Sequence, residues 1–231
     1  MNEVLILSGA GLSADSGLKT FRDNGGLWEE YDVMEVCSVQ GFAKDRKKVL
    51  DFYDKRRLQL KDVKPNAAHF NIANLKAKFK DKISVLTQNV DDLLERAGCE
   101  DVVHLHGELT KLRCERCGKI FDIGYDDMRG KKCPKCGSEF LRHHIVMFGE
   151  MAPFYEVLYQ RLHEMKLFVC IGSSGEVLDI ASYASMAKLS ILNNLASSKI
   201  DRYFDKVYNE TALSAAPKIY KDIEEFLSRQ I

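Results

Sequence analysis

The sequence has no excess charge of either sign, few prolines and no long hydrophobic run. Its 231 residues contain 34 lysines and arginines, 34 aspartates and glutamates, and 4 prolines. A balanced charge weighs against a protein that holds nucleic acid mainly by bulk attraction, because that mode needs a basic surface. No stretch approaches the roughly 20 apolar residues that span a bilayer. The first residues lack the basic start and apolar run of a secretory signal. We therefore expect a cytoplasmic globular protein with no membrane partner and no specific nucleic-acid partner.

The cysteines are odd in number and unevenly spaced. There are seven, and a reducing compartment makes disulfides a poor explanation for them. Four form two tight pairs, Cys114-x-x-Cys117 and Cys133-x-x-Cys136, separated by 15 residues. Two pairs at this spacing are typical of a structural Zn²⁺ site, closed by four thiolates with no position left for water. Chance and a redox Cys-x-x-Cys are the alternatives.

Strand-like and helix-like patterns alternate along the chain. Short apolar runs predict strands at 4–7, 83–87, 102–105, 145–148, 167–171 and 189–192. Helical patterns predict helices at 46–60, at 66–79, at 89–97 and after Pro217. This alternation is typical of an α/β fold with a doubly wound, mostly parallel, Rossmann-like sheet. The basic segment that carries the cysteine pairs interrupts this alternation and indicates a smaller inserted zinc-ribbon domain.

Several polar or glycine-rich segments directly follow predicted strands. They are Gly9-Ala10-Gly11, Gln88-Asn89, His106 and Gly172-Ser173-Ser174. Ligands of doubly wound sheets bind beyond the carboxyl ends of the strands, so these segments are expected to meet at one site. Each is weak alone. Gly9-x-Gly11 lacks the third glycine of a dinucleotide fingerprint and suits an ordinary turn equally well. A single histidine is more often structural than catalytic, and we assign His69 and His104 to the core or surface.

Tyr53 and Arg56 lie three residues apart on a predicted helix and therefore share one face. A phenol beside a guanidinium suits a carboxylate ligand. The pattern alone fits an ordinary amphipathic helix better, with a packed tyrosine and a solvated arginine.

Five blocks in sequence resemble the sirtuin family, and the resemblance covers almost the whole chain. They are the segment from Gly9 to Arg22, Thr87-Gln88-Asn89-Val90-Asp91, His104-Leu105-His106-Gly107-Glu108, the two cysteine pairs, and Phe148-Gly149-Glu150 with Gly172-Ser173-Ser174. The resemblance implies an NAD-dependent enzyme that removes acyl groups from protein lysines and releases nicotinamide and O-acyl-ADP-ribose. It implies an NAD-binding domain of residues 1–30, 82–107 and 143–231. Residues 31–81 would form a helical insert lining the acyl pocket, and residues 108–142 the zinc module.

The resemblance also assigns roles to residues. His106 would be the general base toward a ribose hydroxyl, with Asn89 and Asp91 as further catalytic residues. The NAD-binding set would be Gly9, Ala10, Gly11, Ser13, Ala14, Phe21, Arg22, Trp28, Gln88, Asn89, Val90, Asp91, Gly172, Ser173, Ser174, Asn194, Leu195, Ala196 and Ala212. The acylated peptide would lie as a strand against Val146, Phe148, Gly149, Glu150, Gly175, Glu176 and Val177. One structural Zn²⁺ would be held by Cys114, Cys117, Cys133 and Cys136.

Within this resemblance Tyr53 and Arg56 match sirtuins of the desuccinylase class, which implies recognition of succinyl- or malonyl-lysine as well as acetyl-lysine. The chain departs from the family pattern at Leu94, Asp179, Ala196 and the segment Glu210-Thr211-Ala212. These departures weaken the alignment after about residue 178.

Alternative functions account for some of these motifs. A deacetylase or a protein ADP-ribosyltransferase would use the same fold. An NAD-dependent dehydrogenase would need the absent third glycine. A non-enzymatic zinc-ribbon module would explain the basic residues near the cysteines but leaves most of the chain unexplained.

Overall fold

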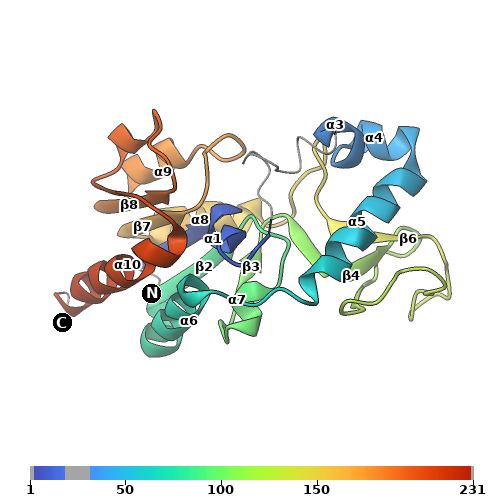
Figure 1. Ribbon diagram of the computed structural model, residues 1–231, viewed down its shortest axis with the longest axis horizontal. Helices are drawn as coiled ribbons and strands as arrows, with labels where there is room; N and C mark the ends of the chain where they lie inside the picture. Colours follow the sequence, from blue (N-terminus) through green and yellow to red (C-terminus); the bar gives the residue numbers. More distant parts are fainter. Residues whose placement is uncertain (1–2, 19–31, 230–231) are drawn as a thin grey trace.

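A computed structural model describes residues 3–18 and 32–229 (Figure 1). Its larger part is built on a six-stranded parallel sheet in the order β3-β2-β1-β7-β8-β9. The strands are β1 (Val4–Ser8), β2 (Ile83–Thr87), β3 (Val103–His104), β7 (Leu167–Ile171), β8 (Leu189–Asn194) and β9 (Lys206–Asn209). Every residue of β1, β2 and β7 is buried, as expected for strands covered on both faces. The doubly wound α/β fold predicted from the sequence is confirmed.

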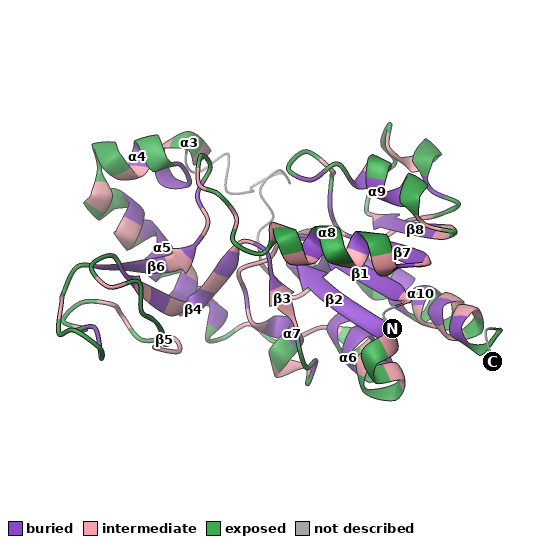
Figure 2. Ribbon diagram, turned by 180° about the vertical axis from the view of Figure 1, so that it is seen from behind, coloured by how far each residue is buried: buried purple, intermediate pink, exposed green. Residues whose placement is uncertain are grey.

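Helices cover both faces of this sheet. Residues Val4 and Ile6 of β1 pack with helices α6 (Ala67–Phe79) and α10 (Ala212–Ser228). Their neighbours Leu5 and Leu7 point the other way, toward α8 (Tyr155–Glu164) and α9 (Ile180–Met186). This is the two-residue period of a strand between two apolar layers. Figure 2 shows the buried strands between the two helical layers.

The smaller part combines three helices with an antiparallel sheet in the order β5-β4-β6. The helices are α3 (Val33–Val36), α4 (Val39–Lys44) and α5 (Arg46–Leu60). The strands are β4 (Gly107–Cys114), β5 (Ile120–Asp122) and β6 (Leu141–Ile145). A separate apolar cluster, which includes Val49 and Phe52 of α5 and Leu109 of β4, joins the helices to this sheet. Short helices α1 (Gly11–Ala14), α7 (Leu93–Arg96), η1 (Lys80–Lys82) and η2 (Asp201–Tyr203) complete the described chain.

The packing differs from the boundaries expected from the sequence. The range 31–81 is divided, because α6 packs in the core of the large sheet, where Ala68 and Ile72 are buried. The strand expected at 145–148 is β6, which ends at Ile145 and pairs antiparallel with β4. The small sheet therefore includes residues 143–145, which were expected in the NAD-binding domain.

Two helices also begin elsewhere than expected. The closing helix starts at Ala212, because the Thr211 side chain accepts a hydrogen bond from the backbone N–H of Ser214 and caps it. Pro217 lies inside this helix. The helix expected at 89–97 is confined to α7. The preceding backbone bonds side chains instead, since Asn89 N–H donates to Thr87 Oγ1 at 3.0 Å.

Among the described residues, we find no helix with the length and apolar character needed to cross a membrane.

Candidate active site

The first turn after β1 packs directly against the turn after β7. Gly9 N–H donates to Ile171 O at 2.9 Å, and Gly11 N–H donates to Gly172 O at 3.0 Å. A Cβ on Gly9 would lie 2.7 Å from Gly172 O, and one on Gly11 would lie 2.6 Å from Gly172 Cα. Only glycine therefore fits at these two positions. This close approach brings together two segments predicted to bind NAD. Ala10 and Ala14 are half-buried beside them, whereas Phe21, Arg22 and Trp28 lie outside the described residues.

Ser13, buried within the short helix α1, connects the predicted catalytic residues. Its Oγ donates to Asp91 Oδ2 at 3.0 Å and accepts from Asn89 Nδ2 at 3.1 Å. His69 Nε2 lies 3.3 Å from the same oxygen. Since His69 Nδ1 accepts from the backbone N–H of Asn66 at 3.2 Å, Nε2 carries the ring proton and donates to Ser13. One hydroxyl thus uses its single hydrogen and both lone pairs to fix Asn89 and Asp91.

His69 is one residue in contact with the site that the sequence interpretation missed. The local sequence offered one indication of its position. The Asn66 side chain caps α6, and His69, three residues later, completes a capping box with it. Burial lowers the pKa of His69 to about 4, so the ring is neutral near pH 7. Burial raises the pKa of Asp91, opposed by the bonds from Leu93 N–H and Ser13 Oγ.

The ends of β2, β7 and β8 are joined by amide side chains. Gln88 Nε2 donates to Ser173 Oγ at 2.9 Å, and Asn194 Nδ2 donates to Ser173 O at 3.0 Å. These three predicted NAD residues therefore form one edge with the glycine turns. Val90 and Gly172 are half-buried in the same region, and Ser174 is exposed.

The three residues predicted at the adenosine end differ in their exposure. Leu195 and Ala196 are exposed beyond β8, whereas Ala212, the first residue of α10, is buried in the core. Ala212 is thus a packing residue at the start of the helix. This end of the site is where the sequence departed from the family pattern.

His106 stands just after β3, half-buried, with both ring nitrogens engaged. Nδ1 lies 3.1 Å from Gln88 O, and Nε2 lies 3.3 Å from the hydroxyl of Tyr155. Burial lowers the pKa of His106, although the Gln88 carbonyl opposes the shift. A neutral imidazole near pH 7 is what a general base requires. His104, by contrast, is buried and bonded to Glu95 Oε1 at 2.7 Å, in agreement with a structural role.

Tyr53 and Arg56 lie on α5 at the other side of the site. Tyr53 is buried, its ring centroid is 5.6 Å from that of His143, and its hydroxyl bonds the Cys37 thiol. Burial raises the pKa of Tyr53 well above its usual value, whereas the charge of Arg56 acts in the opposite direction. Arg56 is half-buried and its Nη1 donates to Gln59 Oε1 at 3.4 Å. The two side chains lie three residues apart on this helix, and a direct bond between them stays a prediction.

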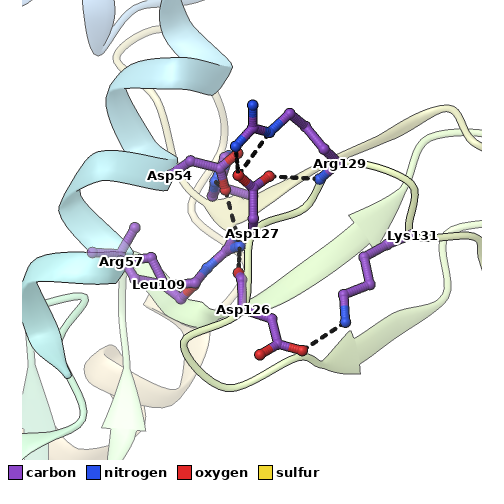
Figure 3. A network of polar contacts seen from close by, with 8 residues as sticks. Asp54, Arg57, Leu109, Asp126, Asp127, Arg129 and Lys131 are labelled. Carbon is purple, nitrogen blue, oxygen red and sulfur yellow. Dashed lines mark hydrogen bonds and ion pairs between the residues drawn. The ribbon is translucent and has the colours of Figure 1, made fainter.

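Helix α5 is anchored by a fully buried arginine. Arg57 donates through Nε to Leu109 O at 2.6 Å and through Nη1 to Asp54 Oδ1 at 3.1 Å and Asp126 O at 3.0 Å (Figure 3). Asp54 Oδ1 also lies 3.0 Å from His143 Nε2. These bonds connect α5 to both β4 and the loop after β5, and so fix the helix that presents Tyr53 and Arg56.

Part of the segment predicted to bind peptide makes hydrogen bonds within the protein. Phe148 N–H donates to Cys37 O at 2.8 Å, and its carbonyl accepts from Val39 N–H at 3.0 Å. Glu150 turns its carboxylate inward, where Arg142 Nη1 and Nη2 donate at 2.6 and 3.1 Å. The backbone of Phe148 and the carboxylate of Glu150 are therefore bonded within the protein, and peptide binding by this segment stays a prediction.

The rest of this segment is placed differently. Val146 N–H donates to His106 O at 2.9 Å. Gly149 and Gly175 have φ of 92° and 79°, a left-handed conformation that favours glycine. Glu176 and Val177 are exposed on the opposite loop.

The four paired cysteines form two equivalent turns. Gly118 N–H donates to Cys114 O and Gly137 N–H to Cys133 O, each at 2.9 Å, and both glycines have φ of 71°. The four sulfurs lie within 4.8 Å of one another, with Cys114–Cys136 and Cys117–Cys133 separations of 3.7 and 3.5 Å. A tetrahedral zinc with bonds of about 2.3 Å sets its sulfurs about 3.8 Å apart.

The chemistry of the cysteines also fits a metal. Although burial opposes it, backbone N–H groups of Cys136 and Lys135 lower the pKa of Cys133 to about 6, which favours the thiolate that zinc binds. All seven cysteines are free thiols. The predicted structural zinc site fits these residues. When bound, the metal joins the end of β4 to the loop before β6, away from His106.

Comparison with known proteins gives consistent results. A profile of the Sir2 family matches residues 9–179. A Campylobacter jejuni protein named NAD-dependent protein deacylase is 62% identical over 228 residues, which cover 98% of each chain. A Helicobacter hepaticus protein of the same name is 42% identical and covers 98% of this chain and 99% of its own.

Solved structures agree. A Sir2 homologue variant bound to ADP-ribose superimposes with a TM-score of 0.87 at 33% identity, covering 98% of this chain and 93% of the other. A Sir2 homologue bound to NAD gives 0.83 at 33% identity, covering 97% and 90%. The predicted sirtuin resemblance and NAD as co-substrate are confirmed. The chain belongs to the Sir2 family.

Proposed function

We propose that this Sir2-family chain, an NAD-dependent protein deacylase, prefers lysines whose acyl group ends in a carboxylate, such as succinyl- and malonyl-lysine. The observation that supports this preference is the placement of a buried Tyr53 and a half-buried Arg56 three residues apart on α5. A half-buried guanidinium gives a strong charge-assisted bond to a carboxylate and gains nothing from an acetyl methyl group.

The remaining residues suit acyl transfer to ADP-ribose. NAD supplies the ribose to which the acyl oxygen attaches as nicotinamide leaves. Ser13 holds Asn89 and Asp91 in place beside the glycine turns. His106, with a neutral ring, takes a proton from a ribose hydroxyl, so that the acyl group ends on ADP-ribose. Acylated protein lysines are the partners, and the four thiolates keep zinc in a structural role. The free thiols favour a reducing compartment such as the cytoplasm.

A deacetylase on the same fold is the second candidate, and one observation favours it. The Tyr53 hydroxyl is already bonded to Cys37 in a buried position. Carboxylate recognition then depends mainly on Arg56.

The test compares succinylated and acetylated forms of one peptide with Arg56→Met. We expect kcat/KM for the succinyl peptide to fall about 10- to 100-fold, as for a lost hydrogen bond to a charged group, while the acetyl value changes less than about twofold. Lys55→Met is the matched control, because it removes an exposed cation from the neighbouring position of α5. Equal losses on both peptides, or a retained succinyl preference, contradict the assignment.

A further inference from the structure

The hydrogen-bond pattern around His106 fixes which nitrogen accepts a proton. The Gln88 carbonyl can only accept, so the Nδ1 atom 3.1 Å from it carries the ring hydrogen. Nε2 of the neutral ring then has one lone pair. The Tyr155 hydroxyl, 3.3 Å away, must donate its hydrogen to that lone pair. The acceptor needed for general-base catalysis is therefore occupied by a side chain of the protein itself.

Tyr155 is placed where substrate binding can move it. It is the first residue of α8, and its ring is 6.3 Å from the His106 ring. The rest of α8 is fixed, since Leu158 and Leu162 are buried against the large sheet. The loop before it carries Met151, which is 93% exposed, and joins Tyr155 to the predicted peptide-binding segment. Burial raises the pKa of Tyr155, with Tyr159 acting in the same direction, so the hydroxyl stays protonated and able to donate.

We propose that Tyr155 caps the catalytic base in the free enzyme and gives up Nε2 when the acylated peptide and NAD bind. The inference rests on the proposed function, in which His106 is the base. The ribose O–H replaces the tyrosine O–H at Nε2, and the tyrosine hydroxyl turns to solvent. Tyr155 is thus a positioning residue that delays availability of the base until substrate is present.

The two half-reactions separate this role from a structural one. Breaking the bond between ribose and nicotinamide moves no proton to His106, whereas the later attack by the ribose hydroxyl does. Exchange of labelled nicotinamide into NAD in the presence of an acetylated peptide reports the first step. Formation of O-acetyl-ADP-ribose reports both.

The experiment uses Tyr155→Phe, which keeps the ring and removes only the hydroxyl. We expect kcat/KM for product to rise about fivefold at pH 8, as for one released neutral hydrogen bond. The value of kcat and the nicotinamide exchange rate should stay within about twofold, because the cap has already left in the ternary complex. Tyr159→Phe, one turn further along α8 and 51% exposed, is the matched control and should change neither quantity.

The pH profile gives a second readout. A bond donated to Nε2 exists only with the neutral ring, so its loss favours protonation. The acid limb of kcat/KM, which reports the free enzyme, should move to higher pH by about 0.7, while the acid limb of kcat should not move. Among the described residues, the titratable groups that face His106 here are Tyr155 and, beyond it, Tyr159; the Gln88 segment contributes an uncharged carbonyl.

Several outcomes overturn the inference. A fall in kcat/KM for Tyr155→Phe means that the hydroxyl assists the reaction. An equal change in exchange and in product formation indicates a structural effect. His106→Ala separates the two proposals: if this variant still forms product at the wild-type rate, the proposed function fails, whatever Tyr155→Phe does.

Discussion

Removing the Ser13 hydroxyl tests whether one atom organises the site. Ser13→Ala leaves Asn89 Nδ2, His69 Nε2 and Asp91 Oδ2 each without a bond that the hydroxyl makes at 3.0–3.3 Å. A bond to a charged group is worth about 1.5–3 kcal/mol and each neutral bond about 1 kcal/mol. Water entering the space left by the oxygen recovers part of this, so we expect unfolding free energy to fall by about 3 kcal/mol.

Differential scanning calorimetry measures this loss directly. For a chain of this size, 3 kcal/mol corresponds to a Tm about 6–12 °C lower. The pKa of Asp91 should rise further, because the Ser13 bond holds it down against burial. KM for NAD should therefore rise most below neutral pH. Ser16→Ala is the control, since Asn66 Nδ2 keeps its bond to Leu12 O when Ser16 is truncated. A Tm within about 1 °C of the wild type with unchanged KM would refute the reasoning.

Three further predictions concern the metal, acid stability and the buried arginine. Native mass spectrometry should find one zinc per chain, lost in Cys133→Ser and kept in Cys99→Ser. His69 has a pKa of about 4 in the folded protein, so its neutral form stabilises the fold. The full stability is present above about pH 6.5, and about 3 kcal/mol of it is lost as the pH falls to 4. In urea titrations at a series of pH values, His69→Gln should remove this pH dependence of the unfolding free energy. Arg57→Met should lower unfolding free energy by about 3–5 kcal/mol because Asp54 loses its buried partner, whereas Arg129→Met, at an exposed pair with Asp127 (Figure 3), should change it by less than about 1 kcal/mol; similar values for the two would contradict this.

The sequence predicted best what depends on local pattern. Three predicted elements agree with the structure residue for residue: the strands at 83–87 and 167–171 and the helix at 46–60. In each of them, the pattern of apolar and charged residues continues without a break from end to end. The cysteine pairs also meet as their spacing required. A motif that fixes geometry within a few residues needs no knowledge of distant contacts.

The sequence failed where distant segments decide the structure. Nothing around His69 indicates that Ser13, 56 residues away, will bond its ring. The inward turn of Glu150 depends on Arg142 in the neighbouring strand. The placement of α6 in the large core depends on α10, which lies at the other end of the chain. In each case a tertiary contact decides the structure, and the local sequence pattern does not indicate it.

The central position of β1 in the sheet has a consequence for how the protein is made. Among the strands of this sheet it leaves the ribosome first, yet it lies between β2 and β7, and its register with β7 pairs Val4 with Leu167. At about 5–20 residues per second, synthesis reaches β7 roughly ten seconds or more after β1 emerges. During that interval one edge of β1, whose first four residues are apolar, has no neighbour. The thiolate module and α5 are complete before β7 is translated, so the smaller part can fold before the large sheet is closed. Until β7 pairs with β1, the exposed edge of β1 should be bound by chaperones that recognise apolar segments of nascent chains.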